Sequence, residues 1–480
     1  MGVIPHRVPR RQSGMVQLVL LIMALSMTLS CSKTAAPPPA APTLPPIAPA
    51  PPPAPPSPAD AALVDEIAHA AFSYFMRETD PRTGLTRDQA RASWSSSAAC
   101  GFALSALAYG AERGWITRTA AMQRAQLTLS TFQNPALQRN GLFPHFLTMD
   151  GQPVRDGETG ISTIDSALLL MGVLTVGEYF GGALATQANA MISNANWRAF
   201  LSPDHTAPLV SMLWAPAVPG DLSGTGALVK CLWSDYTDET IVINVLACGT
   251  PNAAHRLPGS AFYAWNRPRV EYPPGNNFIR SYPNTLFTYA FAHLWLDVRQ
   301  FGVDAHGVDW WSNSYRACVA NRTFCLAHAD RFRTFATNRW GVSPCYDGDS
   351  YLVPQPMPNG LKRDWDINGT VAPYAAGMAL MFMPEHALAA LREMRTLVLN
   401  GTPLWCAPAD GGYGLWDSFN MDSTPPRVTK TVVGIDQGPL LMACANYRDQ
   451  FFWRLLRSNA MVRSAFTAFG FSQLTMNDER

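Results

Sequence analysis

Three carboxylates and a tyrosine stand together in Asp235-Tyr236-Thr237-Asp238-Glu239, directly ahead of an apolar run from Ile241 to Cys248. A carboxyl group that faces apolar surroundings is disfavoured in its charged form, so its pKa rises. A glutamate in such a place can donate a proton near neutral pH, which is the task of a general acid. The alternative is structural, because Asp235 or Asp238 could cap the following helix while Glu239 complements its dipole.

Two further carboxylates stand just ahead of apolar runs. Asp165 precedes a run that ends at Phe180, and Asp436 lies three residues before Pro439 and a second run. Charged residues make up only 15% of the chain, against ~25% in typical soluble domains, so acids in apolar surroundings are few. Glycoside hydrolysis needs two carboxyl groups, one to protonate the leaving oxygen and one to activate water or attack the anomeric carbon. The pattern predicts Glu239, Asp165 and Asp436 as catalytic carboxylates.

Other acids have weaker claims. Glu158 lies in a loop shortly before the first of these runs, and Asp417 stands beside aromatic residues in the segment that ends at Asn420. We expect Asp417 and Asn420 to bind substrate. Asp297 is followed two residues later by Arg299, and a structural ion pair is the favoured interpretation there.

Helices must position these groups. Apolar residues recur at three- and four-residue spacing in long segments, as in amphipathic helices, and several segments are apolar nearly all round, which implies burial on both sides. No run shows the alternation of a sandwich or barrel strand. We therefore predict an all-α fold, an (α/α)6 toroid in which inner-helix ends line a central cleft. The predicted helices cover residues 63–74, 102–109, 120–132, 164–180, 239–248, 285–298, 310–332, 384–399 and 439–456.

The loops between these segments are rich in aromatic residues, as in Ala261-Phe262-Tyr263-Ala264-Trp265 and Gly411-Gly412-Tyr413-Gly414-Leu415-Trp416. Exposed aromatics beside Asp, Asn and Arg suit stacking on sugar rings and hydrogen bonding to hydroxyls. Core packing is the alternative for each single aromatic. Their clustering outside the helices favours a carbohydrate cleft.

The N-terminus has the features of an export signal. Three arginines precede a short apolar run that ends at Leu29, which is typical of a secretory signal peptide over residues 1–30. Thr28-Leu29-Ser30-Cys31 resembles a bacterial lipoprotein processing box, so we expect Cys31 to carry a lipid; ordinary secretion is the alternative. Residues 31–59 are rich in Pro and Ala, which favours a stiff extended tether, and residues 60–480 form the predicted catalytic domain. The protein would thus be exported and held at a membrane of the cell envelope.

Composition excludes several classes of partner. Lys and Arg number 36 against 35 Asp and Glu, so no basic field for nucleic acid exists. No cysteine falls in a CxxC pair and no HExxH occurs, so we expect neither a metal site nor a cofactor. Buried free thiols are expected for most cysteines after Cys31. We expect a monomer.

Several short segments follow one another in a characteristic order: Phe72-Ser73-Tyr74-Phe75, Gly101 to Leu107, Glu112-Arg113-Gly114-Trp115, Ser162 to Leu169, Ala264-Trp265, His293 to Arg299, Asn368 to Pro373, Ile435 to Pro439 and Asn446-Tyr447-Arg448. In this order they resemble the bacterial glycoamylase-like domain family, which includes endo-β-1,2-glucanases and the processing domain of cyclic β-1,2-glucan synthases. The resemblance runs from about Asp65 to Phe471. It implies an (α/α)6 barrel that acts on glucans without a metal.

The resemblance also assigns roles. It places Glu239 on the family's general acid, Asp165 on a candidate base or water-positioning group, and Asp436 on the acid before Gln-Gly-Pro. It implies four cleft residues: Trp265, His293, Trp295 and Gln437. The chain departs from the family at Gly160, where an acid is common, at Thr288 to His293, where a longer polar motif is reduced, and at Asn368, where the family has Asp.

The function predicted from these observations is an exported glycoside hydrolase that cleaves a β-glucan, β-1,2-linked by resemblance, with inversion of the anomeric centre. A retaining β-1,2-glucan transglycosylase is the near alternative. A non-catalytic glycan-binding lipoprotein and a polysaccharide lyase are two further alternatives.

Overall fold

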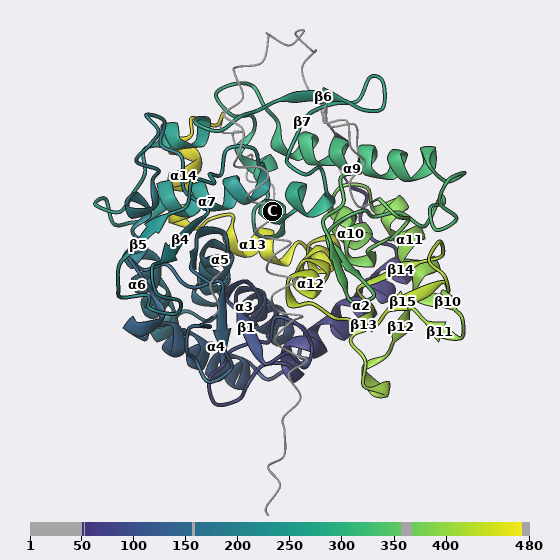
Figure 1. Ribbon diagram of the computed structural model, residues 1–480, viewed down its shortest axis with the longest axis horizontal. Helices are drawn as coiled ribbons and strands as arrows, with labels where there is room; N and C mark the ends of the chain where they lie inside the picture. Colours follow the sequence, from purple (N-terminus) through teal and green to yellow (C-terminus); the bar gives the residue numbers. More distant parts are fainter. Residues whose placement is uncertain (1–49, 52, 156–158, 357–366, 473–480) are drawn as a thin grey trace, which may run out of the picture.

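Helices are the predominant regular structure of the computed structural model, which describes residues 50–51, 53–155, 159–356 and 367–472 (Figure 1). Thirteen α-helices lie in these residues, as the all-α prediction requires. They are α2 (Pro58–Arg77), α3 (Ser97–Glu112), α4 (Arg118–Phe132), α5 (Thr163–Phe180), α6 (Gly182–Asn194), α7 (Asp238–Gly249), α8 (Phe291–Trp295), α9 (Trp310–Ala327), α10 (Pro373–Met378), α11 (Pro384–Thr396), α12 (Gly434–Asp449), α13 (Phe451–Leu456) and α14 (Ala460–Ala468).

Two predicted helices are divided in the structure. Residues 285–298 form a 3-10 turn and the short α8 rather than one helix. The helix expected to begin at Pro439 begins at Gly434, so the proline lies inside α12. That helix ends at Asp449, and the left-handed φ of 58° at Gln450 separates α12 from α13. The helices α6, α10 and α14 were not predicted; α10 has only six residues.

The helices form two layers. Those buried on nearly every face are α3, α5, α7 and α12. Neighbouring inner helices pack in the order α7, α5, α3, α12 and α10, while α14, α6, α4, α2 and α11 cover them from outside. Figure 1 shows α3, α5, α10 and α12 nearer the middle of the molecule than α4, α6 and α11. The apolar composition of the inner helices thus reflects burial on both sides.

The loops contain short strands that the sequence pattern did not predict. Within the described part of the chain, each strand has two to four residues, and all pair antiparallel in seven small sheets. Strands of this length leave too few residues for a visible alternation. They are β1 (Trp94–Ser96), β2 (Phe146–Thr148), β3 (Ile161–Ser162), β4 (Leu213–Pro216), β5 (Gly226–Leu228), β6 (Arg269–Glu271), β7 (Asn277–Ile279), β8 (Cys345–Asp347), β9 (Ser350–Leu352), β10 (Val398–Leu399), β11 (Thr402–Pro403), β12 (Trp405–Cys406), β13 (Gly414–Leu415), β14 (Ser418–Asn420) and β15 (Arg427–Thr429).

Hydrogen bonds join the loops that precede the inner helices. The Gly434 amide at the start of α12 donates to the Asp88 carbonyl (2.8 Å). Strand β1, at the start of α3, pairs with β2, and His145 beside β2 donates to the Gly160 carbonyl (3.0 Å) ahead of α5. The Thr163 amide of α5 then donates to Met212 (3.1 Å).

The same series continues to the start of α7 and back to α12. The Met212 amide donates to Cys231 (2.9 Å), shortly before α7. Strand β14 forms a bridge to Val371 ahead of α10, and the Asp417 amide beside it donates to Thr431 (3.2 Å), close to α12. Because these loops share hydrogen bonds, the first turns of the inner helices are held in register with one another.

Candidate active site

Glu239 lies in the first turn of α7, as the sequence predicted. It is 5% exposed, and its Oε2 atom has no hydrogen-bond partner among the described residues. Burial, and then the neighbouring Asp238 carboxylate, raise the pKa of Glu239 to about 8. A carboxyl group that holds its proton at neutral pH and keeps one oxygen unbonded is suited to protonate a leaving group.

The expected caps of α7 are not formed. Thr237 occupies the N-cap position and makes no side-chain cap. Asp235 instead accepts hydrogen bonds from Ser234 Oγ (2.6 Å) and Asn266 Nδ2 (3.0 Å). Asp238 accepts from the amide of Ala292 in α8 (3.1 Å). Asp235, ahead of α7, and Asp238, its first residue, therefore bind neighbouring segments, and the alternative in which one of them caps the helix is wrong.

Asp165 occupies the first turn of α5 and is 6% exposed. The Ser162 hydroxyl caps the helix by accepting from the Asp165 amide (3.3 Å) and also donates to Asp165 Oδ2. His145 Nε2 lies 3.7 Å from Asp165 Oδ1. Both carboxylate oxygens thus face a polar group, which is what an acid inside a buried helix requires.

Asp436, in the first turn of α12, lies beside Asp417. Asp417 accepts from the Tyr346 amide (2.6 Å), and both carboxyl groups are at most 5% exposed. Burial raises the pKa of Asp417 to about 6, and burial together with Asp417 raises the pKa of Asp436 well above its ordinary value. Two buried carboxyl groups in contact cannot both ionise easily, so the pair retains one proton near neutral pH.

Asp88 is a further carboxylate of the site, and the sequence analysis did not identify it. Its carboxyl group accepts from Ser96 and Trp94 and lies near His145, Asp165 and Asp436. Burial raises its pKa, and the nearby His145 opposes that rise. No apolar helix follows Asp88, so the pattern that identified the other acids could not find it.

Aromatic side chains connect the Asp165 side of the site with the Glu239 side. Trp233 Nε1 donates to Thr163 Oγ1 (2.8 Å) at the start of α5. The Trp233 ring contacts Tyr236 edge to face at 5.0 Å, and Tyr236 contacts Tyr282 at 5.9 Å. Burial and then the Glu239 carboxyl raise the pKa of Tyr236. Within the described residues, no hydrogen bond or ion pair joins Glu239 directly to Asp165 or Asp436.

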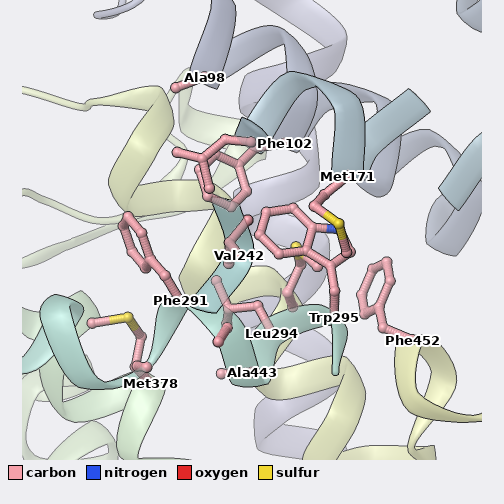
Figure 2. Packing of buried hydrophobic residues seen from close by; sticks show 14 of the residues in the cluster. Ala98, Phe102, Met171, Val242, Phe291, Leu294, Trp295, Met378, Ala443 and Phe452 are labelled. Carbon is pink, nitrogen blue, oxygen red and sulfur yellow. The ribbon is translucent and has the colours of Figure 1, made fainter. Parts of the chain in front are cut away.

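Two predicted cleft residues lie in the core instead. Trp295 is 0% exposed, stacks on Phe102 at 5.3 Å and donates to Ser105 Oγ (3.1 Å). Figure 2 shows its ring between Phe102, Met171 and Phe452. His293 is also 0% exposed, and burial lowers its pKa to about 3. Neither side chain can contact a sugar from these positions, so the prediction that they bind substrate is wrong.

Trp265 and Asn420 are also largely buried. Trp265 is 4% exposed and packs on Trp310 at 5.2 Å and under the Arg267 guanidinium at 4.4 Å. Asn420 uses its amide group to bind Thr370 Oγ1 (3.0 Å) and the Asp422 amide (2.7 Å). These contacts hold both side chains in place, and their role in substrate binding stays a prediction.

The remaining predictions have mixed outcomes. The predicted ion pair between Arg299 Nε and Asp297 Oδ1 is formed at 2.6 Å. Gln437 is buried beside Asp436, with its Oε1 atom unbonded among the described residues, and its role stays a prediction. Glu158 and Cys31 lie outside the described residues. Seven cysteines are free in the described part of the chain, and all but Cys406 are buried, in line with the sequence analysis.

In the described residues, no group of three or more His, Cys, Asp or Glu side chains could hold a metal ion. A cavity of about 230 Å³ lies away from the carboxylates, between Phe132, Gln138 and Met191. One described helix, α5, is long and apolar enough to cross a membrane, but 78% of it is buried inside the fold, as for a core helix.

Comparisons with known proteins agree with the motif analysis. Residues 232–460 match the sequence model of the family described as "Putative glucoamylase", and residues 66–197 match a family described only as a protein of unknown function. Residues 232–460 are thus similar to the glycoamylase-like family.

Relatives with a described activity extend the comparison. An exo β-1,2-glucooligosaccharide sophorohydrolase from Parabacteroides distasonis is 25% identical over 446 residues, which cover 84% of this chain and 57% of that protein. The chain thus spans little more than half of this relative. The structure resembles an endo-β-1,2-glucanase from Chitinophaga pinensis (TM-score 0.71, 21% identity, 85% and 98% of the two chains). It also resembles a β-1,2-glucanase from Parabacteroides distasonis, with a TM-score of 0.72 and 21% identity, over 85% of this chain and 60% of that chain. At these identities the likeness establishes the fold.

Proposed function

We propose that this protein is a glycoside hydrolase that cleaves a β-glucan with β-1,2 linkages. The observation that carries the proposal is Glu239, a buried carboxyl group with a pKa of about 8 and one unbonded oxygen. The names of the Parabacteroides and Chitinophaga proteins support the linkage. Three further carboxylates, Asp88, Asp165 and Asp436, supply the acids that a second catalytic role requires.

In the proposed mechanism Glu239 protonates the glycosidic oxygen while a second carboxylate activates water. The second group must be ionised to accept a proton. Asp436 shares a proton with Asp417, so it is poorly suited to that task. Asp165 has a serine hydroxyl on one oxygen and His145 near the other, and we place the base there. Water attack opposite the leaving group inverts the anomeric centre.

Product analysis tests this function. Linear β-1,2-glucan is incubated with the protein, and the first products are followed by NMR. Release of shorter β-1,2-glucooligosaccharides with the α-anomer appearing first supports inverting hydrolysis. Cyclic or lengthened products would instead favour the transglycosylase, and unsaturated products absorbing in the ultraviolet would favour the lyase. Binding without turnover would favour the non-catalytic lipoprotein.

The remaining predictions complete the proposal. The paired inner and outer helices and the hydrogen-bonded loops support an (α/α)6 toroid whose inner-helix first turns form the reaction centre. The basic and apolar N-terminus supports export, and the box that ends at Cys31 supports a lipid anchor at the cell envelope. A monomer acting on oligosaccharides or polysaccharides is consistent with these features.

A further inference from the structure

We propose that His145 is a positioning residue for Asp165, which it holds in the orientation that accepts a proton from water. This inference rests on the proposed function and adds a residue that neither the catalytic pattern nor the family motifs identified. His145 Nε2 lies 3.7 Å from Asp165 Oδ1, within ion-pair distance. Such contacts are often long in a free enzyme and shorten when substrate is bound.

The backbone of His145 is fixed from both sides. Its amide donates to the Gly160 carbonyl (3.0 Å), and its carbonyl accepts from the amide of Ser97, the first residue of α3 (3.1 Å). Gly160 has no room for a side chain, because an added Cβ would lie 2.3 Å from the Trp214 carbonyl oxygen. The start of α3 and the loop before α5 therefore set the place of His145 relative to Asp165.

The imidazole ring is oriented as well. It stacks on Phe146 with 3.7 Å between the ring centroids and 20° between the planes. The side chain is 25% exposed, in contrast to the fully buried His293. Aromatic stacking leaves the ring little freedom to turn away from the carboxylates. A histidine with only a structural role would not need to face Asp165 from a partly open position.

His145 also faces a second carboxylate. Asp88 lies close enough for the imidazole to oppose the rise that burial causes in the Asp88 pKa. The Ser162 hydroxyl donates to Asp165 Oδ2, so His145 and Ser162 hold different oxygens. A carboxylate can accept about four hydrogen bonds, so Asp165 keeps further acceptor positions for water. With His145 and Ser162 in place, the carboxylate plane is held and those positions are fixed relative to the helix.

Steady-state kinetics on linear β-1,2-glucan test the proposal with the full chain. In His145→Ala we expect kcat to fall by about 100-fold, the size expected when a catalytic group is displaced by about 1 Å, with KM unchanged within about threefold. His145→Gln places an amide donor near the Nε2 position, and its kcat should be at least tenfold higher than that of His145→Ala. A merely structural role would not give this rescue.

His255→Ala is the matched control, because His255 is also half-buried and bonds a backbone carbonyl (Ser193, 2.8 Å) away from the carboxylates. It should leave kcat unchanged. A His145→Ala kcat within twofold of the wild type, or no rescue by Gln in a folded protein, would overturn the inference.

The failure of the proposed function gives a different result. If the wild type cleaves no glucan, that function is rejected, and His145 is then examined by ¹⁵N NMR of its imidazole. Movement of its resonances in Asp165→Asn, without movement of those of His255, supports the pairing. Unmoved resonances contradict it.

Discussion

Burial of carboxyl groups in the first turns of helices dominates the chemistry of this site at the scale of single residues. Glu239, Asp165 and Asp436 each occupy the first turn of an inner helix. The positive end of the helix dipole favours a negative charge there, while loss of water opposes it. For Glu239 the loss of water prevails, since its pKa rises to about 8.

Glu239→Gln should change how stability depends on pH. The folded protein holds a proton on Glu239 up to about pH 8, while an unfolded glutamate releases it near 4.5. The stability due to this proton is complete below pH 4.5 and is lost as pH rises through about 8. Glutamine has no proton to lose. Between pH 4.5 and about 8, the unfolding free energy of the variant should therefore rise relative to that of the wild type by up to ~1.4 kcal/mol per pH unit.

Urea denaturation at several pH values measures this difference. Exposed Glu385, in the first turn of α11, gives the control variant Glu385→Gln, whose stability should run parallel to that of the wild type. If the unfolding free energies of Glu239→Gln and the wild type differ by the same amount at every pH from 4.5 to 8, the raised pKa of Glu239 is contradicted.

Asp436→Asn should stabilise the protein at alkaline pH. The raised pKa values of Asp417 and Asp436 mean that the stability of the pair declines as pH rises, for Asp417 through about 6. Removing one ionisable member removes part of that decline. We expect a higher unfolding free energy than the wild type at pH 8 and a smaller difference at pH 5. Exposed Asp410 gives the control variant Asp410→Asn. If the unfolding free energy changes with pH equally in the wild type and both variants, Asp417 and Asp436 do not share a proton.

Features that follow from local surroundings could be predicted, such as the place of Glu239 in the first turn of a buried helix. Glu239 was identified because an apolar run follows it directly. Asp88 and His145 were missed because only hydrogen bonds between distant loops bring them to Asp165. Trp295 and His293 were misassigned because a motif shows that residues occur together but not whether the core buries them.

At the scale of elements, apolar runs predicted most helices because the inner layer is buried on all sides. Residues 285–298 are the exception, since the Asp238 carboxylate binds the Ala292 amide where a continuous helix would use that amide itself. The short strands could not be predicted, because two to four residues are too few to show an alternation. Strand β1 in addition pairs with β2, which follows α3 and α4 in the chain.

Close packing of α3 on α5 yields a prediction. An added Cβ on Gly172 would lie 2.2 Å from the Gly101 carbonyl oxygen, and one on Gly101 would lie 2.3 Å from that of Leu168. Gly172→Ala should therefore force the helices apart and cost about 1–3 kcal/mol of unfolding free energy. Thermal unfolding measures the loss. The control Thr119→Ala, on an exposed turn of α4, should change the thermal stability little. If Gly172→Ala is as stable as the wild type, α3 and α5 are not held at this distance.

At the scale of the whole molecule, the folded part follows a long Pro- and Ala-rich segment and a lipoprotein-type box. Such a segment would hold the domain away from a membrane. Cys31→Ser should abolish labelling by radioactive palmitate in a bacterial host and move the protein from the membrane fraction to the soluble fraction. Cys406→Ser removes another thiol that is not fully buried and should have no effect. Membrane retention of Cys31→Ser would contradict the lipid anchor.

The most direct measurement of the central claim compares wild type and Glu239→Gln on linear β-1,2-glucan. The wild type should release β-1,2-glucooligosaccharides, with a rate that declines as pH rises above about 8 because the acid loses its proton. Glu239→Gln should remain folded and lose activity by about 10²–10⁴-fold. A wild type that cleaves no β-1,2-glucan, or a Glu239→Gln variant as active as the wild type, would contradict the account.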